Sequence, residues 1–181
     1  MYKYQIEDAY KNRPVIELFK KYYPERSQYM VRTIKGGKIQ YFIVARCGDE
    51  IVGAMGISDH KDGVFTFSYE VTHPDHRRKF IANSTRYLGL KFCFESGAEI
   101  VKMNREKHIA FSKERVISMG FCLIHTMGRN KQQNIARKHY GLPPLPVRYY
   151  YELRKEDFPR EKVNKIWKLI KSGKQQQMIK T

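Results

Sequence analysis

A short basic segment, HRRK at residues 76–79, separates a run of strand-forming residues from an apolar pattern with helical spacing. The run before it, residues 64–72, is rich in β-branched and aromatic side chains, and Pro74 ends it. The pattern after it, residues 81–96, predicts a helix. The first N–H groups of a helix lack intrahelical acceptors and lie at the positive end of its dipole. The sequence therefore predicts an anion-binding turn at residues 76–79, and the alternative is an exposed basic turn without a ligand.

Two histidines flank the Pro-Asp pair before this segment, which raises the question of a metal site. His73 and His76 are suitable ligands, but no further ligands follow at suitable spacing, so we expect no metal. The chain has three cysteines, Cys47, Cys93 and Cys122. An odd number without close pairs argues against a disulfide framework or a zinc ribbon, and predicts reduced thiols in a cytoplasmic protein.

The elements that must position the basic segment alternate between helices and strands. We expect helices over residues 6–22, 81–96, 107–119 and 162–171. We expect strands over residues 31–34, 40–46, 51–58, 64–72, 98–103, 121–127 and 147–153. Residues 128–146 are expected to be irregular and residues 173–181 frayed. A strand–helix–strand unit makes a parallel crossover, whereas hairpins add antiparallel strands. The fold class is therefore α/β, with a mixed, mostly antiparallel sheet flanked by helices.

The length of 181 residues favours one domain with an extension. We expect a domain over residues 1–153 and a basic C-terminal helix and tail over residues 154–181. Val163, Ile166 and Ile170 share one face of that helix with Trp167, which predicts either a lid packed by Trp167 or an arm that binds a surface. The sequence has no apolar run of about 18 residues and no apolar N-terminal stretch, so we expect neither a membrane span nor a secretory signal.

The segment THPDHRRKFIANSTRYLGLKF, residues 72–92, resembles the signature of the GNAT superfamily of N-acyltransferases. In that signature a proline follows a strand, and Arg or Gln, two residues, Gly, one residue, and Gly or Ala open a helix. These places are occupied here by Pro74, Arg77, Phe80 and Ala82. The helix ending at Met119-Gly120-Phe121 and the hairpin ARCGDEIVGAMGI, residues 45–57, are also similar to the family. The resemblance covers about half of the chain and implies a GNAT-like fold.

The resemblance also implies a cofactor, acetyl-CoA or another acyl-CoA, whose pyrophosphate lies at the basic turn. The residues that would hold the cofactor are Val71, Thr72, Arg77, Arg78, Lys79, Phe80, Ile81, Ala82 and Asn83. Two positions depart from the family. Phe80 replaces the first glycine, which normally lets the backbone approach the phosphate. Val116 stands where the family usually has a tyrosine that protonates the departing thiolate.

Acyl transfer to an amine needs a neutral nucleophile and often a base. Glu70, on the strand before the turn, could take the proton directly or through water; the alternative is a surface carboxylate paired with a cation. Its neighbour Tyr69 is expected on the opposite face of the sheet. His108 could act as acid or base near neutral pH, or could be an ordinary histidine at a helix start. Ser112, about one turn later, could hydrogen-bond to cofactor or substrate.

The second half of the chain is strongly basic. The net charge is +17; residues 1–100 contain 16 Lys/Arg and 12 Asp/Glu, whereas residues 101–181 contain 19 and 6. Such a charge attracts polyanions, although it can also serve solubility alone. The cations between residues 122 and 151 occur among tyrosines that could stack on exposed bases. The predicted nucleic-acid contacts are Arg129, Lys131, Arg137, Lys138 and Arg148.

Three functions remain open at this point. The first is an acyl-CoA-dependent N-acyltransferase that acts on a nucleic acid or a nucleic-acid-associated amine, such as aminoacyl-tRNA, a DNA base or a basic protein. A faint similarity to phage Mom-type DNA-modification proteins, at Asn83-Ser84 and in the basic tail, belongs to this hypothesis. The second is a GNAT enzyme that acetylates a small amine or a protein. The third is a non-catalytic GNAT-fold protein that binds nucleic acid. The sequence does not indicate an oligomeric state.

Overall fold

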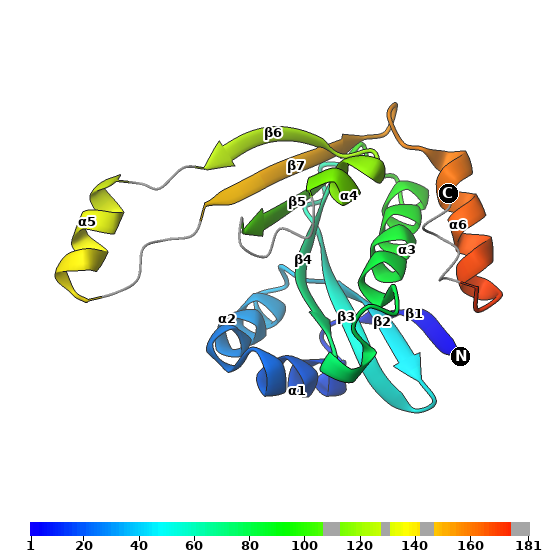
Figure 1. The fold of residues 1–181 in the computed structure, drawn as a ribbon, viewed down its shortest axis with the longest axis horizontal. Coiled ribbons are helices and arrows are strands. Elements are labelled where there is room, and N and C mark those ends of the chain that lie inside the picture. Colours follow the sequence, from blue (N-terminus) through cyan, green and yellow to red (C-terminus); the bar gives the residue numbers. More distant parts are fainter. Residues whose placement is uncertain (107–112, 128–130, 142–146, 175–181) are drawn as a thin grey trace.

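A seven-stranded sheet is the centre of the fold (Figure 1). The computed structural model describes residues 1–106, 113–127, 131–141 and 147–174. The sheet has the order β1-β2-β3-β4-β5-β7-β6, with strands β1 (Tyr2–Asp8), β2 (Tyr41–Cys47), β3 (Glu50–Asp59), β4 (Val64–Thr72), β5 (Ile100–Glu106), β6 (Cys122–Met127) and β7 (Arg148–Arg154). β4 and β5 are parallel, and all other neighbouring strands are antiparallel. The predicted α/β class with a mixed, mostly antiparallel sheet is confirmed.

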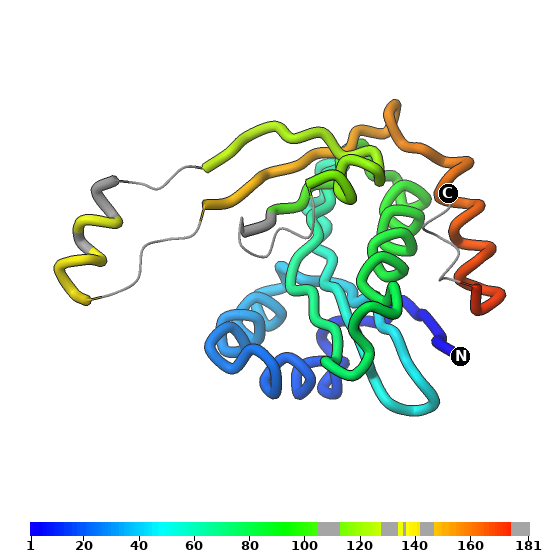
Figure 2. The backbone as a smooth tube through the Cα atoms, in the orientation of Figure 1, coloured from blue at the N-terminus to red at the C-terminus, as the bar shows by residue number. Residues whose placement is uncertain are grey.

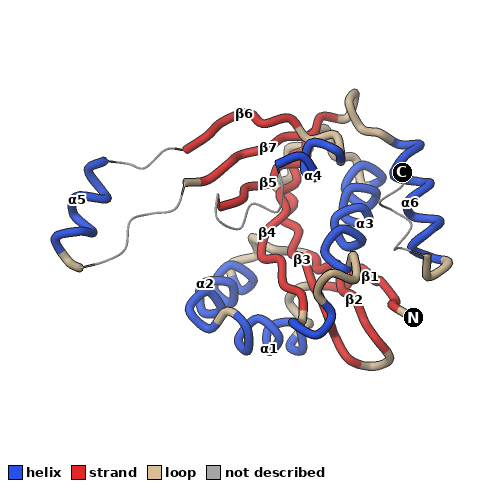
Figure 3. The backbone as a smooth tube through the Cα atoms, in the orientation of Figure 1, coloured by secondary structure: helices blue, strands red, loops and turns tan. Residues whose placement is uncertain are grey.

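Helices cover both faces of this sheet (Figure 3). The helices are α1 (Arg13–Tyr22), α2 (Pro24–Lys35), α3 (Ile81–Glu95), α4 (Lys113–Ser118), α5 (Lys131–His139) and α6 (Arg160–Lys171), with a 3-10 turn over Pro74–His76. Apolar residues of α1 and α2 form one core cluster with β2, β3 and β4. Those of α3 and α6 form a second cluster with the other side of the same strands.

The central strands have no polar face because both of their faces are buried. In β2, Phe42 and Val44 pack towards α1 and α2, whereas Ile43 packs on the α3 side. Successive side chains of a strand point to opposite faces, so a strand covered on both faces reads as a continuous apolar run. This explains the sequence YFIVA at the start of β2.

The N-terminal segment differs from the predicted single helix over residues 6–22. Residues 2–8 form the edge strand β1, which pairs with β2 over its whole length. α1 begins only at Arg13, where Oδ1 of Asn12 accepts a hydrogen bond from the N–H of Val15 at 3.2 Å. Pro14 lies in the first turn of α1, where its missing N–H costs nothing. The prediction was wrong because the helical spacing was read across this cap.

Two further segments also differ from the predictions. Residues 31–34, expected as a strand, lie in α2, where Ile34 is buried in the core; tertiary packing overrides the β propensity of Val31 and Ile34. The region 128–146, expected to be irregular, contains the helix α5. Of the helix predicted over residues 107–119, the structure describes Lys113–Ser118, and residues 107–112 lie outside the described residues. Of the tail 173–181, only residues 173 and 174 are described.

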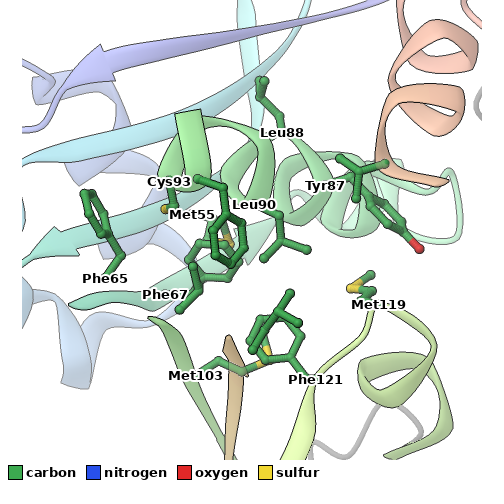
Figure 4. Packing of buried hydrophobic residues seen from close by; sticks show 14 of the residues in the cluster. Met55, Phe65, Phe67, Tyr87, Leu88, Leu90, Cys93, Met103, Met119 and Phe121 are labelled. Carbon is green, nitrogen blue, oxygen red and sulfur yellow. The ribbon is translucent and has the colours of Figure 1, made fainter. Parts of the chain in front are cut away.

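The cluster on the α3 side is the larger core (Figure 4). Leu88, Leu90 and Cys93 of α3 pack there against Phe67 of β4 and Phe121 before β6. α6 lies on α3 and adds Val163, Ile166 and Ile170 to the same cluster, with Trp167 partly buried beside it. The terminal helix is therefore packed on the core through its apolar face, and its lysines lie on the outside.

The two ends of the described chain lie close together (Figure 2). A side chain added at Gly173, just after α6, would come within 3.6 Å of Cγ of Met1. All three cysteines are free thiols, and burial raises the pKa of Cys93 well above its usual range. No helix in the described ranges is long and apolar enough to cross a membrane.

The close approach of α3 to β3 depends on Gly53. A Cβ at this position would lie 2.6 Å from Cγ2 of Ile81, the first residue of α3. We expect Gly53→Ala to lower the free energy of unfolding by about 1–3 kcal/mol, because the β-branched Ile81 has little room to turn away. Urea unfolding measures this loss. In an Ile81→Ala background the same substitution should cost much less; an equal loss in both backgrounds would contradict the contact.

Candidate active site

A bulge in β4 sets the geometry of the site. Ala54 of β3 pairs with Val71 and Gly56 pairs with Ser68, so two residues of β4, Tyr69 and Glu70, lie opposite one residue of β3. Tyr69 has a positive φ of 49°. A bulge of this kind bends the strand and increases its local twist.

The bulge also exchanges the faces to which β4 side chains point. Before it, Phe65 and Phe67 pack in the cluster on the α3 side. After it, Tyr69 and Val71 pack with the cluster on the α1 and α2 side. A strand without a bulge would keep all four odd-numbered residues on one face. Glu70 consequently faces α3, and the predicted placement of Tyr69 on the opposite face is confirmed.

β4 and β5 part at the bulge. They pair only from Val64–Ile100 to Phe67–Met103, although β4 continues to Thr72 and β5 to Glu106 (Figure 1). Beyond this point β4 pairs with β3 and β5 pairs with β7. Within the described residues, the edge of β4 that faces β5 therefore has no strand partner from residue 68 onwards. The backbone groups on this edge, including those of Val71 and Thr72, have no ladder partner on the β5 side.

The basic turn that follows β4 is held in place by contacts to β1 and β3. The N–H of His73 donates to the carbonyl of Val52 at 2.8 Å. The Tyr2 hydroxyl lies 3.0 Å from Nδ1 of His76. No group of three or more potential metal ligands occurs in the described part of the chain.

The start of α3 has the features of an anion site. The N–H groups of Ile81, Ala82 and Asn83 are the first of the helix and have no intrahelical acceptor. α3 has no side-chain cap. Exposed cations precede this helix start at Arg77, Arg78 and Lys79. Positive charge and N–H groups thus lie together at the positive end of the α3 dipole, an arrangement that binds phosphate groups in proteins.

Phe80 adopts the backbone conformation that a glycine would favour. Its φ is 61° and its ψ is 13°, in the left-handed region, and Arg78 also has a φ of 61°. The Phe80 ring is partly buried against the larger core cluster. The turn therefore keeps its shape without glycine, at a cost of about 1–2 kcal/mol for the left-handed residue.

Glu70 is held in a buried ion pair with Arg86 of α3. Nη2 of Arg86 donates to Oε2 of Glu70 at 2.6 Å, and the two side chains are only 4% and 10% exposed. Nη1 of Arg86 donates to Oδ1 of Asn83 at 3.2 Å. Burial raises the pKa of Tyr4, whose hydroxyl interacts with Ser84 of α3, to about 12. The pair joins the bulge of β4 to the first turns of α3.

The other predicted site residues are distributed as follows. His108, Ser112 and Arg129 lie outside the described residues, and Lys131 lies in α5 with its side chain outside them. Val116, at the position of the family's tyrosine, is 2% exposed in the core.

Arg137 and Lys138 lie in the last turn of α5, and Arg148 begins β7. The described parts of β6, α5 and β7 form an arm that extends from the sheet (Figure 1). Its exposed side chains include apolar residues as well as cations, among them Ile124, Met127, Ile135 and Tyr140.

Solved structures share this arrangement. No protein-family model matches the sequence, and no curated protein matches it. An alanine N-acetyltransferase of a ribosomal protein from Escherichia coli superimposes with a TM-score of 0.67 at 8% identity, over 85% of this chain and 94% of that one. A GNAT family acetyltransferase from Elizabethkingia anophelis with acetyl-CoA bound has a TM-score of 0.65 at 9% identity, over 84% and 97%. A Bacillus subtilis acetyltransferase in complex with CoA has a TM-score of 0.65 at 11% identity, over 85% and 99%.

The chain has the GNAT fold. Within this fold, the sequence predicts the strand, turn and helix around residues 64–95. It also allows Glu70 to be a surface carboxylate paired with a cation, but it identifies neither Arg86 as the partner nor the burial of the pair. Arg86 is the only Arg in the helix sequence IANSTRYLGLKFCFE, and it occupies a buried position. The helix contains two cations, Arg86 and Lys91, and no sequence signal shows which of them is buried; a buried charge needs a partner, and for Arg86 that partner is Glu70.

Phe80 allows the backbone strain of the turn to be measured. We expect Phe80→Gly to be more stable than Phe80→Ala by about 1 kcal/mol, because both lose the ring and only glycine accepts the left-handed conformation without strain. Chemical denaturation of the two variants gives this difference. At Ala82, in the regular first turn of α3, Ala82→Gly should instead destabilise by roughly 0.5–1 kcal/mol. An alanine as stable as glycine at position 80 would contradict the strain.

The ion pair should behave as a buried pair in a double-mutant cycle. Glu70→Leu or Arg86→Met alone should destabilise the protein by about 3–5 kcal/mol, since each leaves one charge buried without its partner. The double variant should regain most of this loss, because no buried charge remains. Urea unfolding of the four proteins measures the coupling, and additive losses would show that the pair is not coupled.

Proposed function

We propose that this protein is an acyl-CoA-dependent N-acyltransferase. The observation that carries the proposal is the parting of β4 from β5, followed by the exposed cations and unsatisfied N–H groups at the start of α3. A cofactor that has a long chain and a pyrophosphate matches these two features. The long chain of the cofactor would lie along the open edge of β4 at Val71 and Thr72, and its pyrophosphate would lie at residues 77–83. The proteins of this fold that were solved with CoA or acetyl-CoA support the same assignment.

Arg77, Arg78 and Lys79 supply the charge that the pyrophosphate needs, and the N–H groups of residues 80–83 supply directed hydrogen bonds. Ile81 is buried against β3 and fixes the start of the helix, so these N–H groups keep their direction. The nine predicted cofactor residues lie between the end of β4 and the first turn of α3; the side chains of Val71 and Ile81 are buried, so these two would contribute backbone groups only.

During acyl transfer the acceptor amine attacks the thioester carbonyl, loses a proton and releases a thiol. The Glu70 carboxylate is already held by Arg86, so its geometry suits a positioning role better than proton transfer. As a positioning residue it ties the bulge, where the strands part, to the helix that binds the pyrophosphate. Glu70→Gln separates the two roles. If Glu70 is the base, turnover should be lost with its charge; if it is a positioning residue, the amide can still hydrogen-bond and turnover should be partly retained. His108 and Ser112 remain candidates for proton transfer and substrate binding.

We further propose that the acceptor amine belongs to a nucleic acid or to a molecule bound to one. The net charge of +17 and the cations of the arm at Arg137, Lys138 and Arg148 support this class. β7, which belongs to the arm, pairs with β5, and β5 borders the open edge of β4. A polyanion on the arm would therefore be close to the bound cofactor.

A non-catalytic GNAT-fold protein that binds nucleic acid is the second candidate. It is favoured by Val116, which is buried and brings no hydroxyl to the place of the family's proton donor. It is also favoured by Phe80, whose Cβ occupies the turn where glycine leaves room for phosphate. The two candidates differ in whether CoA binds.

Thermal-shift titration with CoA and acetyl-CoA tests the proposal. Saturation at about 100 times the Kd should stabilise the protein by about 2.7 kcal/mol. Arg77→Ala and Ala82→Trp should weaken this effect, because the first removes charge from the turn and the second blocks the helix start. Arg160→Ala, an exposed arginine on α6, is the matched control and should change nothing. If neither ligand raises the Tm, the enzyme proposal is wrong and the binding protein remains.

The same assay with a single-stranded oligonucleotide at two salt concentrations tests the acceptor class. Affinity should fall steeply with salt, by a slope of about 0.7 per phosphate contact on single strands. The double variant Arg137→Ala/Lys138→Ala should reduce that slope by about 1.4. An oligonucleotide effect that is independent of salt, or absent, would contradict a nucleic-acid acceptor.

A further inference from the structure

A group of aromatic side chains lies beside the bulge, on the face of the sheet that α1 and α2 cover. The Tyr69 ring meets Phe19 of α1 edge-on, with centroids 6.3 Å apart and an interplanar angle of 85°. It also lies 6.3 Å from the ring of Tyr29 of α2, at an angle of 38°. The Tyr69 hydroxyl is 3.2 Å from Oγ1 of Thr33. Tyr69 is thus fixed from three sides by α1 and α2, and burial raises its pKa.

Tyr29 is the outer member of this group. Its side chain is 68% exposed, although its ring is supported from below by Tyr69. A large exposed aromatic ring that rests on a fixed second ring keeps its orientation and leaves one face open. Such a face suits a planar, π-bonded ligand.

Two cations lie on the same side of α2 as Tyr29. On α2, Arg26 and Arg32 lie three residues before and after Tyr29 and therefore share its side of the helix. The last turn of α1 adds Lys20 and Lys21, and the last turn of α2 adds Lys35. The carboxylates of the two helices are Glu17, which pairs with Lys20 at 2.9 Å, and Glu25 in the first turn of α2. Positive charge therefore predominates on α1 and α2.

We propose that Tyr29, supported by Tyr69, is a stacking platform for one unpaired base of a single-stranded nucleic acid, with Arg32 and its neighbouring cations binding the adjacent phosphates. Aromatic rings among cations bind single strands in this way, since every base has a π-face and every linkage a charge. Tyr69 and Glu70 form the bulge, so the stacked base would lie next to the place where β4 and β5 part. The inference rests on the proposed nucleic-acid acceptor and assigns it a position at the site.

The position explains why the platform would matter for the reaction. The cofactor turn lies at the end of β4, after Thr72, and the bulge lies a few residues before it on the same strand. A base held at Tyr29 would bring the nucleotide, or an amine attached nearby, to the α1 and α2 side of the open edge. The arm of β6, α5 and β7 would bind a more distant part of the same strand. Two separate contacts along one strand give both affinity and register.

A fluorescence titration tests this platform directly. The probe is a single-stranded DNA of about 12 nucleotides that contains 2-aminopurine, whose emission falls when it stacks on an aromatic ring. Wild-type protein at low salt should bind the probe and quench it. Tyr29→Leu should weaken binding by about five- to a hundredfold and abolish the quenching at saturation, because leucine keeps the helix and removes the ring. Tyr29→Phe should retain both, since stacking needs the ring and not the hydroxyl.

Tyr10→Leu is the matched control. Tyr10 is 73% exposed, follows β1 and makes no ring contact with the described residues, so its loss should leave binding and quenching unchanged. All four proteins are also titrated with CoA by thermal shift, and CoA binding should be the same in each.

The outcomes separate the platform from the proposed function. Loss of quenching in Tyr29→Leu alone supports the platform. Equal binding and quenching by wild type and Tyr29→Leu overturn it and leave the acyltransferase proposal intact. Quenching that Tyr10→Leu removes as well overturns it, because the contact is then non-specific. A wild-type protein that binds CoA but not the probe overturns both the platform and the nucleic-acid acceptor, whereas a protein that binds the probe but not CoA contradicts only the enzyme.

Discussion

The one-residue bulge at Tyr69 is the constraint on which the rest of the structure depends. It ends the pairing of β4 with β5 after Phe67 and leaves one edge of β4 open. It also exchanges the faces of the strand, so that Tyr69 and Val71 meet α1 and α2 whereas Glu70 meets α3. A regular strand would pair to its end and would place Glu70 out of reach of Arg86.

The cost of this irregular strand is met by packing on both sides of it. On one side Tyr69 is fixed by Phe19, Tyr29 and Thr33. On the other side the Glu70–Arg86 pair joins the bulge to α3, and Arg86 in turn bonds to Asn83 in the first turn. The start of α3 is therefore positioned by the same residues that open the strand edge. The open edge of β4 and the start of α3 are therefore mechanically connected.

The basic turn shows how a fold can keep a conformation after its usual residue is replaced. Phe80 holds the left-handed conformation that glycine would adopt without strain, and its ring gains contact with the core. The strain is local and is offset by packing, as is common at binding sites. Phe80 also adds a Cβ to the turn that a glycine would lack.

Much of this organisation follows from the sequence by itself. Strands that are covered on both faces read as apolar runs, and β4 was located to the residue because Pro74 and Gly63 border it. The turn is predicted from the basic segment at residues 76–79 and α3 from the helical spacing of residues 81–96, and the excess of cations in the second half is a matter of composition. Local signals of this kind do not depend on which elements become neighbours.

Only the tertiary structure decided the features that arise between distant segments. β1 is a strand because β2 offers it an edge, and residues 31–34 are helical because Ile34 fits the core. A bulge is a mismatch between two strands and has no fixed sequence signature, so the face of Glu70 and its pairing with Arg86 could not be read from periodicity. The same holds for Tyr29 and Tyr69, which are 40 residues apart and meet only because α2 folds over the bulge. Periodicity predicts which side of an element is buried; the partner it is buried against is determined by the assembled sheet.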